Sequence, residues 1–461
     1  MVDQPSSLPS VLDFATWEPV LRLLRDGRAE EEAVPAIRVG GRIGRGSWNL
    51  PLRREDTRGE TEAVERVREA LVAAGVEDVW FTAKMSPDGK STLRLRGASP
   101  AVESDSGTPH PALLLVEGAV PQPWRRVPDP VPAAVAAPSA DPALLERTLR
   151  ERMPDAIGAT HAEIAAAEAR IGVALPAELK ALYQVTRARW DDREDWEDDD
   201  EAAERACEAV GCELFPLDEL YVADASSRPC PWEFAAMEAV VTAPDAAVQG
   251  LVGSPGWIAF GDNGGGDRLA VDLTPGPCGH IGQIIILSHE GHIGASLVAD
   301  SLTDLVMGRP SERSGDSGGD RPPAVAHVNV RSVPSVEAAA HPGLEVLSIG
   351  VWDAEPLSLA PVIGLPRLRT LAAYPGTLAD PREIAGLTTL EFLALGPEEW
   401  RLLLDAGAVP RSLSAAVVKV HGDADPLSTV PVANEILALW DRPRIIRTVL
   451  EGDLGPASLV G

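Results

Sequence analysis

The first 120 residues alternate between helical and strand-like patterns of hydrophobic positions. Two stretches carry hydrophobic residues three or four positions apart, as on one face of a helix: Leu12, Trp17, Val20, Leu21 and Leu24, and then Val64, Val67, Leu71 and Val72. We expect Thr61 to cap the second helix and Gly75 to end it. Strands are predicted at 36–43, 79–85, 91–96 and 113–116, and the run Ser86-Pro87-Asp88-Gly89 predicts the turn of a hairpin. Residues 1–120 are therefore expected to form a small α+β module.

Two stretches without a hydrophobic period divide the chain. Residues 121–142 are rich in Pro and Ala, a composition that favours polyproline II and predicts a semi-rigid linker. Residues 311–323 are rich in Ser, Gly, Asp and Arg and predict a flexible linker. The expected domains are therefore 1–120, 143–310 and 324–461, and a prior of about 150 residues per domain agrees with three units.

The middle domain, residues 143–310, begins with two short helices and continues with strands. Thr160 and Glu163 have the spacing of a capping box, and Gly172 is placed to end the first helix. Pro176 starts the second helix, since proline is tolerated in a first turn. Strands are predicted at 256–261, 267–273 and 281–287, with a glycine turn at 262–266.

A repeated leucine pattern marks the last domain, residues 324–461. The motifs are Leu344-x-x-Leu347-x-Ile349, Leu368-x-x-Leu371-x-Ala373 and Leu390-x-x-Leu393-x-Leu395, at a spacing typical of leucine-rich repeats. Such repeats place a short strand on a concave face, with the positions between the leucines facing solvent: Glu345, Ser348, Arg369, Ala372, Glu391 and Ala394. We take Arg369 and Glu391 as candidate partner-binding residues. The predicted fold class is multidomain α+β, ending in a short leucine-rich-repeat-like solenoid.

Composition and charge narrow the function. The 461 residues are 45% hydrophobic and 24% charged, as in an ordinary globular protein, and the net charge is −29. This charge disfavours nucleic acid and anionic membranes and favours encounter with a basic protein, although acidity also serves solubility alone. No secretory signal is evident, and the longest apolar stretch, residues 281–287, is far shorter than the roughly 20 residues of a membrane span. We therefore expect a cytoplasmic protein without membrane insertion, its four cysteines reduced.

Two blocks of the middle domain resemble the SUKH superfamily, which includes the fungal Smi/Knr cell-wall-assembly regulators. The first is HAEIAAAEARIGVALPAELKALY at 161–183, and the second is WIAFGDNGGGDRLAVDL at 257–273. The resemblance covers about residues 160–307 and implies a mixed α+β fold that works by binding proteins. Bacterial relatives commonly act as immunity proteins that neutralise toxins, often nucleases or deaminases. Where the family has an Asn-Gly turn after the second helix, this chain carries an acidic run at 190–201 instead.

The acidic run supports two interpretations. Blocks of like charge are usually solvated loops, whereas acidic faces also capture Arg-rich partners. Tryptophans within the run favour a contact surface, since tryptophan is enriched at binding hot spots. We take as candidate partner-binding residues Trp190, Trp196, Asp198, Asp199 and Asp200.

Several histidine, cysteine and aspartate motifs resemble metal-binding or catalytic sites but lack residues that such sites need. The run His289-Glu290-Gly291-His292 lacks the spacing of a zinc-protease helix and is better explained as a turn after a strand. Cys207 and Cys212 lack a second pair of metal ligands, and the run from Asp262 to Asp267 lacks the closing Glu of a calcium loop. We therefore predict no catalytic residue, metal or cofactor, and keep Asp262, Asn263 and Asp267 as candidate partner-binding residues.

The sequence thus predicts a non-enzymatic protein that works by binding another protein. The leading hypothesis is a bacterial immunity-type protein, whose partner would be a basic toxin domain. The alternative is an adaptor or regulatory scaffold of cell-envelope or signalling machinery. A third hypothesis, a cryptic hydrolase, rests only on Asp267, His289 and His292.

Overall fold

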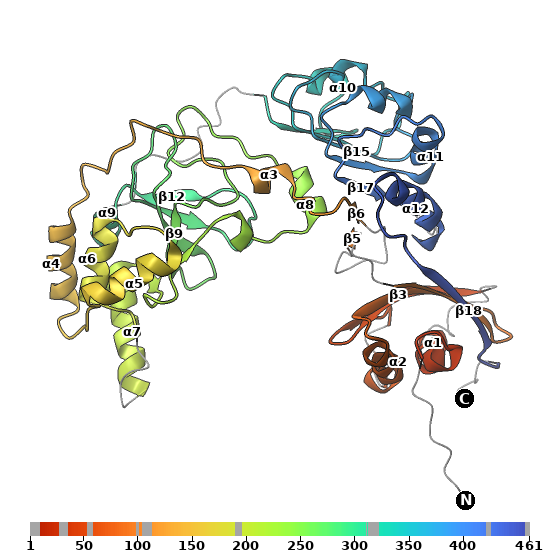
Figure 1. Ribbon diagram of the computed structural model, residues 1–461, viewed down its shortest axis with the longest axis horizontal. Coiled ribbons are helices and arrows are strands. Elements are labelled where there is room, and N and C mark those ends of the chain that lie inside the picture. Colours follow the sequence, from red (N-terminus) through yellow and green to blue (C-terminus); the bar gives the residue numbers. More distant parts are fainter. Residues whose placement is uncertain are drawn as a thin grey trace, which may run out of the picture. The chain divides into compact units, whose positions relative to one another are not determined.

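The computed structural model describes residues 10–26, 36–52, 59–97, 101–103, 113–189, 196–309, 311, 322–420 and 426–456 (Figure 1). The chain divides into two compact units. One contains Met1–Ala119 and Ala326–Gly461, and the other contains Val120–Val325. None of the helices in the described residues is long and apolar enough to cross a membrane.

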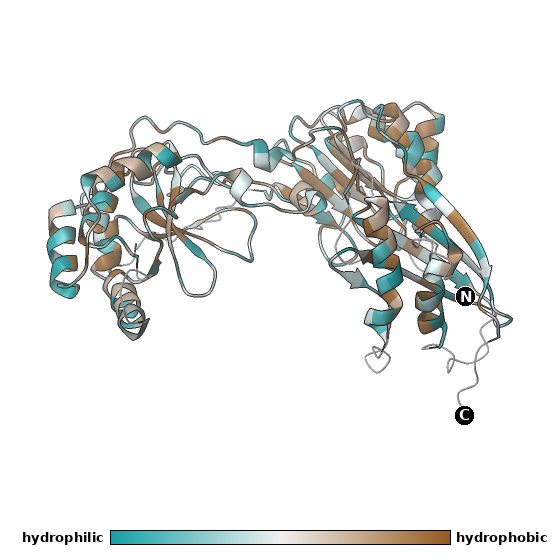
Figure 2. Ribbon diagram, turned by 60° about the horizontal axis from the view of Figure 1, so that its bottom comes forward, coloured by the Kyte–Doolittle hydropathy of each residue, from teal (hydrophilic) through white to brown (hydrophobic). Residues whose placement is uncertain are grey.

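The first unit contains an antiparallel sheet with two helices packed on one face. The sheet has the order β18-β4-β3-β1-β2, formed by β1 (Ile37–Gly44), β2 (Trp48–Asn49), β3 (Asp78–Met85), β4 (Lys90–Gly97) and β18 (Arg447–Asp453). Helices α1 (Phe14–Asp26) and α2 (Glu60–Ala74) bury Trp17 and Val64 against Phe81 of β3. Figure 2 shows hydrophilic and hydrophobic colours side by side along these helices, as expected where only one face is buried.

Several local predictions for this sheet hold and a few need correction. Gly75 ends α2 in the left-handed conformation, and the turn at 86–89 joins β3 to β4 with a hydrogen bond from Gly89 N to Ser86 O of 2.9 Å. Leu12, however, precedes α1 and is exposed, and Val72 is exposed on α2. Thr61 is no cap, because α2 begins at Glu60 after Gly59.

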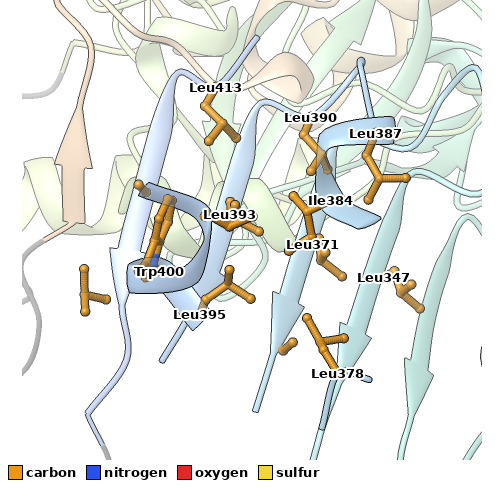
Figure 3. Packing of buried hydrophobic residues seen from close by; sticks show 14 of the residues in the cluster. Leu347, Leu371, Leu378, Ile384, Leu387, Leu390, Leu393, Leu395, Trp400 and Leu413 are labelled. Carbon is orange, nitrogen blue, oxygen red and sulfur yellow. The ribbon is translucent and has the colours of Figure 1, made fainter. Parts of the chain in front are cut away.

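A second sheet in this unit is built mainly from parallel strands. Its order is β13-β14-β15-β16-β17-β6-β5, formed by β13 (Val325–Val328), β14 (Val346–Ile349), β15 (Thr370–Ala373), β16 (Phe392–Leu395), β17 (Ala415–Val418), β6 (Leu113–Leu115) and β5 (Val102–Glu103). The parallel register aligns Leu347, Leu371, Leu393 and Ala416. Figure 3 shows the three leucines side by side in the core. The strands lie where the leucine motifs predict them, and their assignment to leucine-rich repeats stays a prediction.

Short helices follow the strands of this array and cover its leucine core. They are α10 (Val336–Ala339), α11 (Pro397–Asp405), α12 (Val430–Leu439) and the 3-10 turns η2 (Ala360–Val362), η3 (Pro381–Gly386) and η4 (Pro426–Thr429). Trp400 of α11 is fully buried and donates from Nε1 to Val417 O at 2.9 Å.

The positions between the leucines do not all face solvent as predicted. Glu345, Arg369, Ala372 and Ala394 are buried. Arg369 Nε lies 3.4 Å from Glu345 Oε2, so these two charges compensate each other inside the protein. The alternation of side chains along a strand indicates which positions share a face of the sheet. It does not indicate whether other parts of the protein pack on both faces.

Two antiparallel pairings join the beginning of the chain to its end. β6 pairs with β17, and β4 pairs with β18. These segments were predicted to lie in separate domains, 1–120 and 324–461, because a pairing between segments hundreds of residues apart leaves no local signal in the sequence.

The middle unit is a six-stranded sheet with helices on one face. The strand order is β12-β11-β10-β9-β7, and β8 also pairs with β9. The strands are β7 (Glu213–Leu214), β8 (Tyr221–Val222), β9 (Trp257–Asp262), β10 (Arg268–Asp272), β11 (Gln283–Leu287) and β12 (Ser296–Ala299). Alternate residues form two clusters, with Ile258 and Phe260 facing the helices and Trp257 and Ala259 in the second cluster.

The helices that pack on the first cluster stand together at one side of the unit in Figure 1. They are α4 (Pro142–Arg152), α5 (His161–Ile171), α6 (Ala177–Val185), α7 (Trp196–Val210) and α9 (Leu302–Val306). Shorter pieces are α3 (Gln122–Arg125), η1 (Ala225–Ser227) and α8 (Trp232–Met237). The capping box of α5 is confirmed, since Thr160 Oγ1 accepts from Glu163 N at 3.2 Å and Thr160 N donates to Glu163 Oε2 at 2.6 Å. Gly172 ends α5, and α6 follows Pro176.

The Pro/Ala-rich stretch at 121–142 is packed on the middle unit rather than spanning a gap as a linker. Trp124 Nε1 donates to Arg228 O at 2.9 Å, and Asp129 N donates to Gln249 Oε1 at 2.8 Å. Further along, Val135 O accepts from Ile281 N at 3.0 Å. Composition indicates an extended backbone here, but these backbone groups find partners on the folded domain. Of the second predicted linker, 311–323, only residues 311, 322 and 323 are among the described residues.

Candidate functional site

The turn between β9 and β10 brings together three of the predicted partner-binding residues. Asp262 Oδ1 accepts the backbone N–H of Gly264 at 2.7 Å and of Gly266 at 3.2 Å. Both glycines have positive φ, which few other residues tolerate. Asn263 Oδ1 accepts from Asp267 N at 3.1 Å, and Asn263 Nδ2 donates to Asp267 Oδ2 at 2.9 Å. The acidic and amide side chains therefore hold the shape of the turn as well as contributing its surface.

Arg268 links this turn to the segment around β7 and β8. Its guanidinium group forms an ion pair with Asp262 Oδ2 and lies over the Phe215 ring, 5.4 Å from the ring centre. Phe215 in turn stacks on Tyr221, with ring centres 6.3 Å apart. The Asp262 side chain is almost fully buried, whereas that of Arg268 is 43% exposed. The charged end of Arg268 is thus held in one place at the surface by a carboxylate and an aromatic ring.

His289 joins the same surface from the connection between β11 and β12. Asp267 Oδ1 accepts from His289 N at 2.9 Å and lies 2.7 Å from His289 Nδ1. The hydrogen bond from the His289 backbone lowers the pKa of Asp267, and the His289 side chain lowers it further. Asp267 is therefore ionised at neutral pH, and half of the His289 side chain remains exposed. We call Asp262, Asn263, Asp267, Arg268 and His289 the hairpin-end surface.

Arg228 fixes the loop that carries His289. Its guanidinium group donates to four backbone carbonyls, those of Val252 at 2.7 Å, Gly294 at 2.9 Å, Ser288 at 3.2 Å and Gly291. Burial lowers the pKa of Arg228, but an arginine remains charged at neutral pH. The loop at 288–294 is thus tied to the rest of the domain by Arg228, which fixes the position of His289.

The described residues show where the patterns that suggested chemistry lie. No group of three or more metal-ligating side chains occurs among the described residues. The run from His289 to His292 lies in the connection between the antiparallel strands β11 and β12, not on a helix such as the zinc-protease motif requires. Burial raises the pKa of Cys212 to about 12, so its thiol stays protonated and is a poor nucleophile or metal ligand at neutral pH.

The remaining predicted partner-binding residues lie in other segments of the chain. Arg369 is buried and Glu391 is half-buried in the other compact unit. Trp190 lies outside the described residues. Trp196 and Asp198–Asp200 form the beginning of α7, so the interpretation of this part of the acidic run as a loop is wrong, while the positions of these side chains are not described.

Sequence reasoning missed Arg268, Phe215 and Arg228. Arg268 directly follows Asp267 at the start of a strand, so its proximity to the turn could have been inferred. Phe215 and Arg228 reach this region only through tertiary packing, for which no local pattern exists.

Comparison with known families assigns the middle unit. Residues 158–308 match the SMI1 / KNR4 family (SUKH-1). This part of the chain is therefore a SUKH-type domain, as the two sequence blocks predicted.

Three fungal proteins are similar to a short segment of this chain. The "Glucan synthesis regulatory protein" of Neurospora crassa is 40% identical over 67 residues, which are 14% of this chain and 13% of that protein. "KNR4/SMI1 homolog 2" of Debaryomyces hansenii is 36% identical over 69 residues, 15% of this chain and 12% of that protein. "KNR4/SMI1 homolog" of Eremothecium gossypii is 35% identical over 65 residues, 14% of this chain and 10% of that protein. Each likeness thus covers only a small share of this chain and of the relative.

Proposed function

We propose that this chain is a non-enzymatic regulatory adaptor that binds a protein partner through the hairpin-end surface of its SUKH-type domain. The observation that carries the proposal is the preorganised set of Asp262, Asp267, Arg268 and His289, which are fixed by hydrogen bonds and aromatic contacts while part of each of the last two remains exposed. Groups held in place beforehand lose little entropy on binding. The regulatory name of the Neurospora protein supports the same class of function.

The partner is expected to carry a basic surface. The chain has a net charge of −29, which raises the rate of encounter with a basic protein and suppresses encounter with acidic ones. Binding should therefore weaken as salt screens the charges, since the Debye length falls from about 10 Å at 0.1 M to about 3 Å at 1 M ionic strength.

The immunity hypothesis ranks second. It shares the same binding surface and would require a toxin domain as partner. Because the three matched relatives named above are fungal and one is named a regulator, the adaptor hypothesis has the better support.

Affinity capture with the full-length chain tests the proposal. Asp267→Asn combined with His289→Gln removes the carboxylate and the imidazole that contact each other at the hairpin end. The control Asp155→Asn changes an exposed carboxylate elsewhere in the same unit. We expect one basic protein to be enriched by the wild type and the control and lost with the double variant. Recovery of a toxin domain would promote the immunity hypothesis, whereas equal recovery by all three proteins would exclude the hairpin-end surface as the binding site.

A further inference from the structure

Asp267 holds the ring of His289 in one tautomer. Asp267 Oδ1 lies 2.7 Å from His289 Nδ1 and accepts from His289 N at 2.9 Å. Because these hydrogen bonds lower the pKa of Asp267, its carboxylate is ionised and has no proton to donate. The proton between the two side chains therefore belongs to Nδ1. A neutral imidazole has only one N–H group, so in the neutral ring His289 Nε2 is a hydrogen-bond acceptor.

This acceptor nitrogen lies at the outer edge of the ring. A Cβ atom placed on Gly266 would lie 3.3 Å from His289 Cγ and 3.4 Å from His289 Nδ1, so the Cγ–Nδ1 edge faces the turn between β9 and β10. Nε2 is the ring atom opposite that edge, and 52% of the side chain is exposed. In the part of the chain that the structure describes, no group donates a hydrogen bond to Nε2. A donor of a partner can therefore take this place.

The turn between β9 and β10 uses its backbone donors internally. Each backbone N–H group from residue 263 to residue 267 donates to an acceptor of the turn itself. These acceptors are the side chains of Asp262 and Asn263 and the carbonyl oxygen of Asp267. Among the described residues, none donates to the carbonyl oxygens of 263–266. A partner that meets this turn therefore finds backbone acceptors rather than backbone donors.

Carboxylates lie beside these acceptors. Glu213 of β7 is exposed, and a Cβ atom placed on the exposed Gly264 would lie 3.2 Å from Glu213 Oε1. Asp267 keeps its negative charge while it holds the His289 ring. Both negative charges favour a cationic group near the turn.

The guanidinium groups of this region are engaged by other partners. Arg268 forms an ion pair with Asp262, and Arg228 donates to four backbone carbonyls, those of residues 252, 288, 291 and 294. Their positive charges are thus compensated by a carboxylate or solvated by carbonyl dipoles. They leave the turn carbonyls and His289 Nε2 as acceptors for a partner.

We propose that the hairpin-end surface binds an ammonium or guanidinium side chain of the partner, which donates to His289 Nε2 and to the carbonyl oxygens of the β9–β10 turn. This inference rests on the proposed function and specifies the partner residue that the surface recognises. Lys and Arg side chains carry several N–H donors and no acceptor, so they match a surface of acceptors. Hydrogen bonds from a charged donor are roughly twice as strong as those between neutral groups. Asp267 acts as a positioning residue, because it fixes the tautomer of His289.

NMR of the full-length chain with 15N-labelled histidine measures the tautomer directly. Protonated and bare ring nitrogens differ in 15N chemical shift, and the His289→Gln spectrum identifies the His289 signals by their loss. In the neutral ring of the wild type we expect a proton on Nδ1 and a bare Nε2. Asp267→Asn should give a mixture of tautomers, because an amide both donates and accepts. A proton on Nε2 of the wild type would overturn the inference.

Short peptides test the ligand class. The probes are acetyl-Ala-Ala-X-Ala-Ala-amide peptides, where X is lysine, arginine or norleucine. Isothermal titration calorimetry gives the affinity, and the 15N shift of His289 Nε2 reports the contact. We expect a cationic peptide to bind at least about tenfold more tightly than the norleucine peptide, which matches one hydrogen bond to a charged group. Tighter binding of the lysine peptide would identify an ammonium group, and tighter binding of the arginine peptide a guanidinium group. Equal affinity for all three, or no binding at millimolar concentration, would overturn the inference.

A ring variant and a matched control complete the test. His289→Phe keeps an aromatic ring without Nε2 and should lose the preference for the cationic peptide. His292→Phe changes another exposed histidine of the same loop and should keep it, whereas an equal loss in both variants would contradict the inference. The wild-type measurements remain decisive if His289→Phe does not fold.

Affinity capture separates this inference from the proposed function. If the hairpin-end surface captures a protein but the peptides do not discriminate, this inference fails and the adaptor proposal stands. If the cationic peptide shifts His289 Nε2 but capture recovers the same proteins with the wild type and the double variant, the proposed function fails and the cation-binding surface stands.

Discussion

Asp272 is a fully buried carboxylate at the end of β10, and its titration should make the SUKH-type domain more stable at mildly acidic pH. It accepts hydrogen bonds from Trp257 Nε1 at 3.0 Å, Gln283 Nε2 at 2.9 Å and Thr274 N at 2.8 Å. Burial nevertheless raises its pKa to about 6, because these hydrogen bonds offset only part of the cost of desolvating the charge.

The direction of the pH effect follows from the raised pKa. The folded state binds the proton more tightly than the unfolded state, whose Asp titrates near 3.9. The stabilisation by Asp272 is therefore fully present below about pH 4 and is lost as the pH rises through about 6. The shift corresponds to about 3 kcal/mol in total, of which about 1 kcal/mol is gained between pH 7 and pH 5.

Hydrogen exchange of the β9, β10 and β11 amides measures this effect locally, which matters because a chain with two compact units need not unfold in one step. After correction for intrinsic exchange, protection in the wild type should be greater at pH 5 than at pH 7. Asp272→Asn removes the titrating group, so the difference between the two pH values should shrink by about 1 kcal/mol. If the wild type and the variant show the same pH dependence, Asp272 is not the group responsible.

Three further predictions concern other buried groups. Leu393→Ala, in the buried row of Leu347, Leu371 and Leu393, should lower the free energy of unfolding of the first unit in urea by about 3 kcal/mol. The control Leu402→Ala, at a half-exposed position of α11, should lower it far less. Glu178 accepts hydrogen bonds from Thr303 N at 3.0 Å and Leu302 N at 3.2 Å. Glu178→Ala should therefore destabilise the middle unit by about 2 kcal/mol in urea unfolding. An unchanged unfolding midpoint would show that the backbone N–H groups at the start of α9 form other hydrogen bonds in the variant. Iodoacetamide at pH 8 should alkylate the exposed Cys278 well before Cys212, because burial raises the pKa of Cys212 to about 12. Mass spectrometry of the native and the unfolded protein measures the order of alkylation. Alkylation of Cys212 first in the native protein would show that its thiol is accessible.

Local sequence signals predicted those parts of the fold that depend on neighbouring residues. The capping box of Thr160 and Glu163 and the glycine end of α5 are formed within a few residues, so their residue types suffice to place them. The β9–β10 hairpin was predicted for the same reason, because its turn needs glycines at positive φ and an Asx side chain to accept their N–H groups.

The candidate site was predicted only in part because its contacts span long separations. Asp262, Asn263 and Asp267 are close in sequence and were found together. Arg268 packs on Phe215 from 53 positions away in the chain, and Arg228 reaches the loop at 288–294 through backbone carbonyls that carry no residue-specific signal. The prediction for Arg369 was wrong for a related reason. It was predicted to face solvent, but it is buried and forms an ion pair with Glu345.

The domain boundaries depend on which backbone groups find hydrogen-bond partners, and composition reports this poorly. The proline-rich residues 121–142 were expected to form a semi-rigid linker, yet backbone groups of Asp129 and Val135 form hydrogen bonds with the middle unit. Likewise β6 pairs with β17 and β4 pairs with β18, although the whole middle unit lies between these strands in the sequence. Leaving a buried N–H or C=O group unpaired costs more free energy than a hydrogen bond contributes to stability. The pairing of backbone groups therefore determines the boundaries of a compact unit more strongly than the amino-acid composition of a predicted linker does. The middle unit, which contains the SUKH-type domain, is consequently inserted in the sequence of the first unit, with β6 before it and β13 after it.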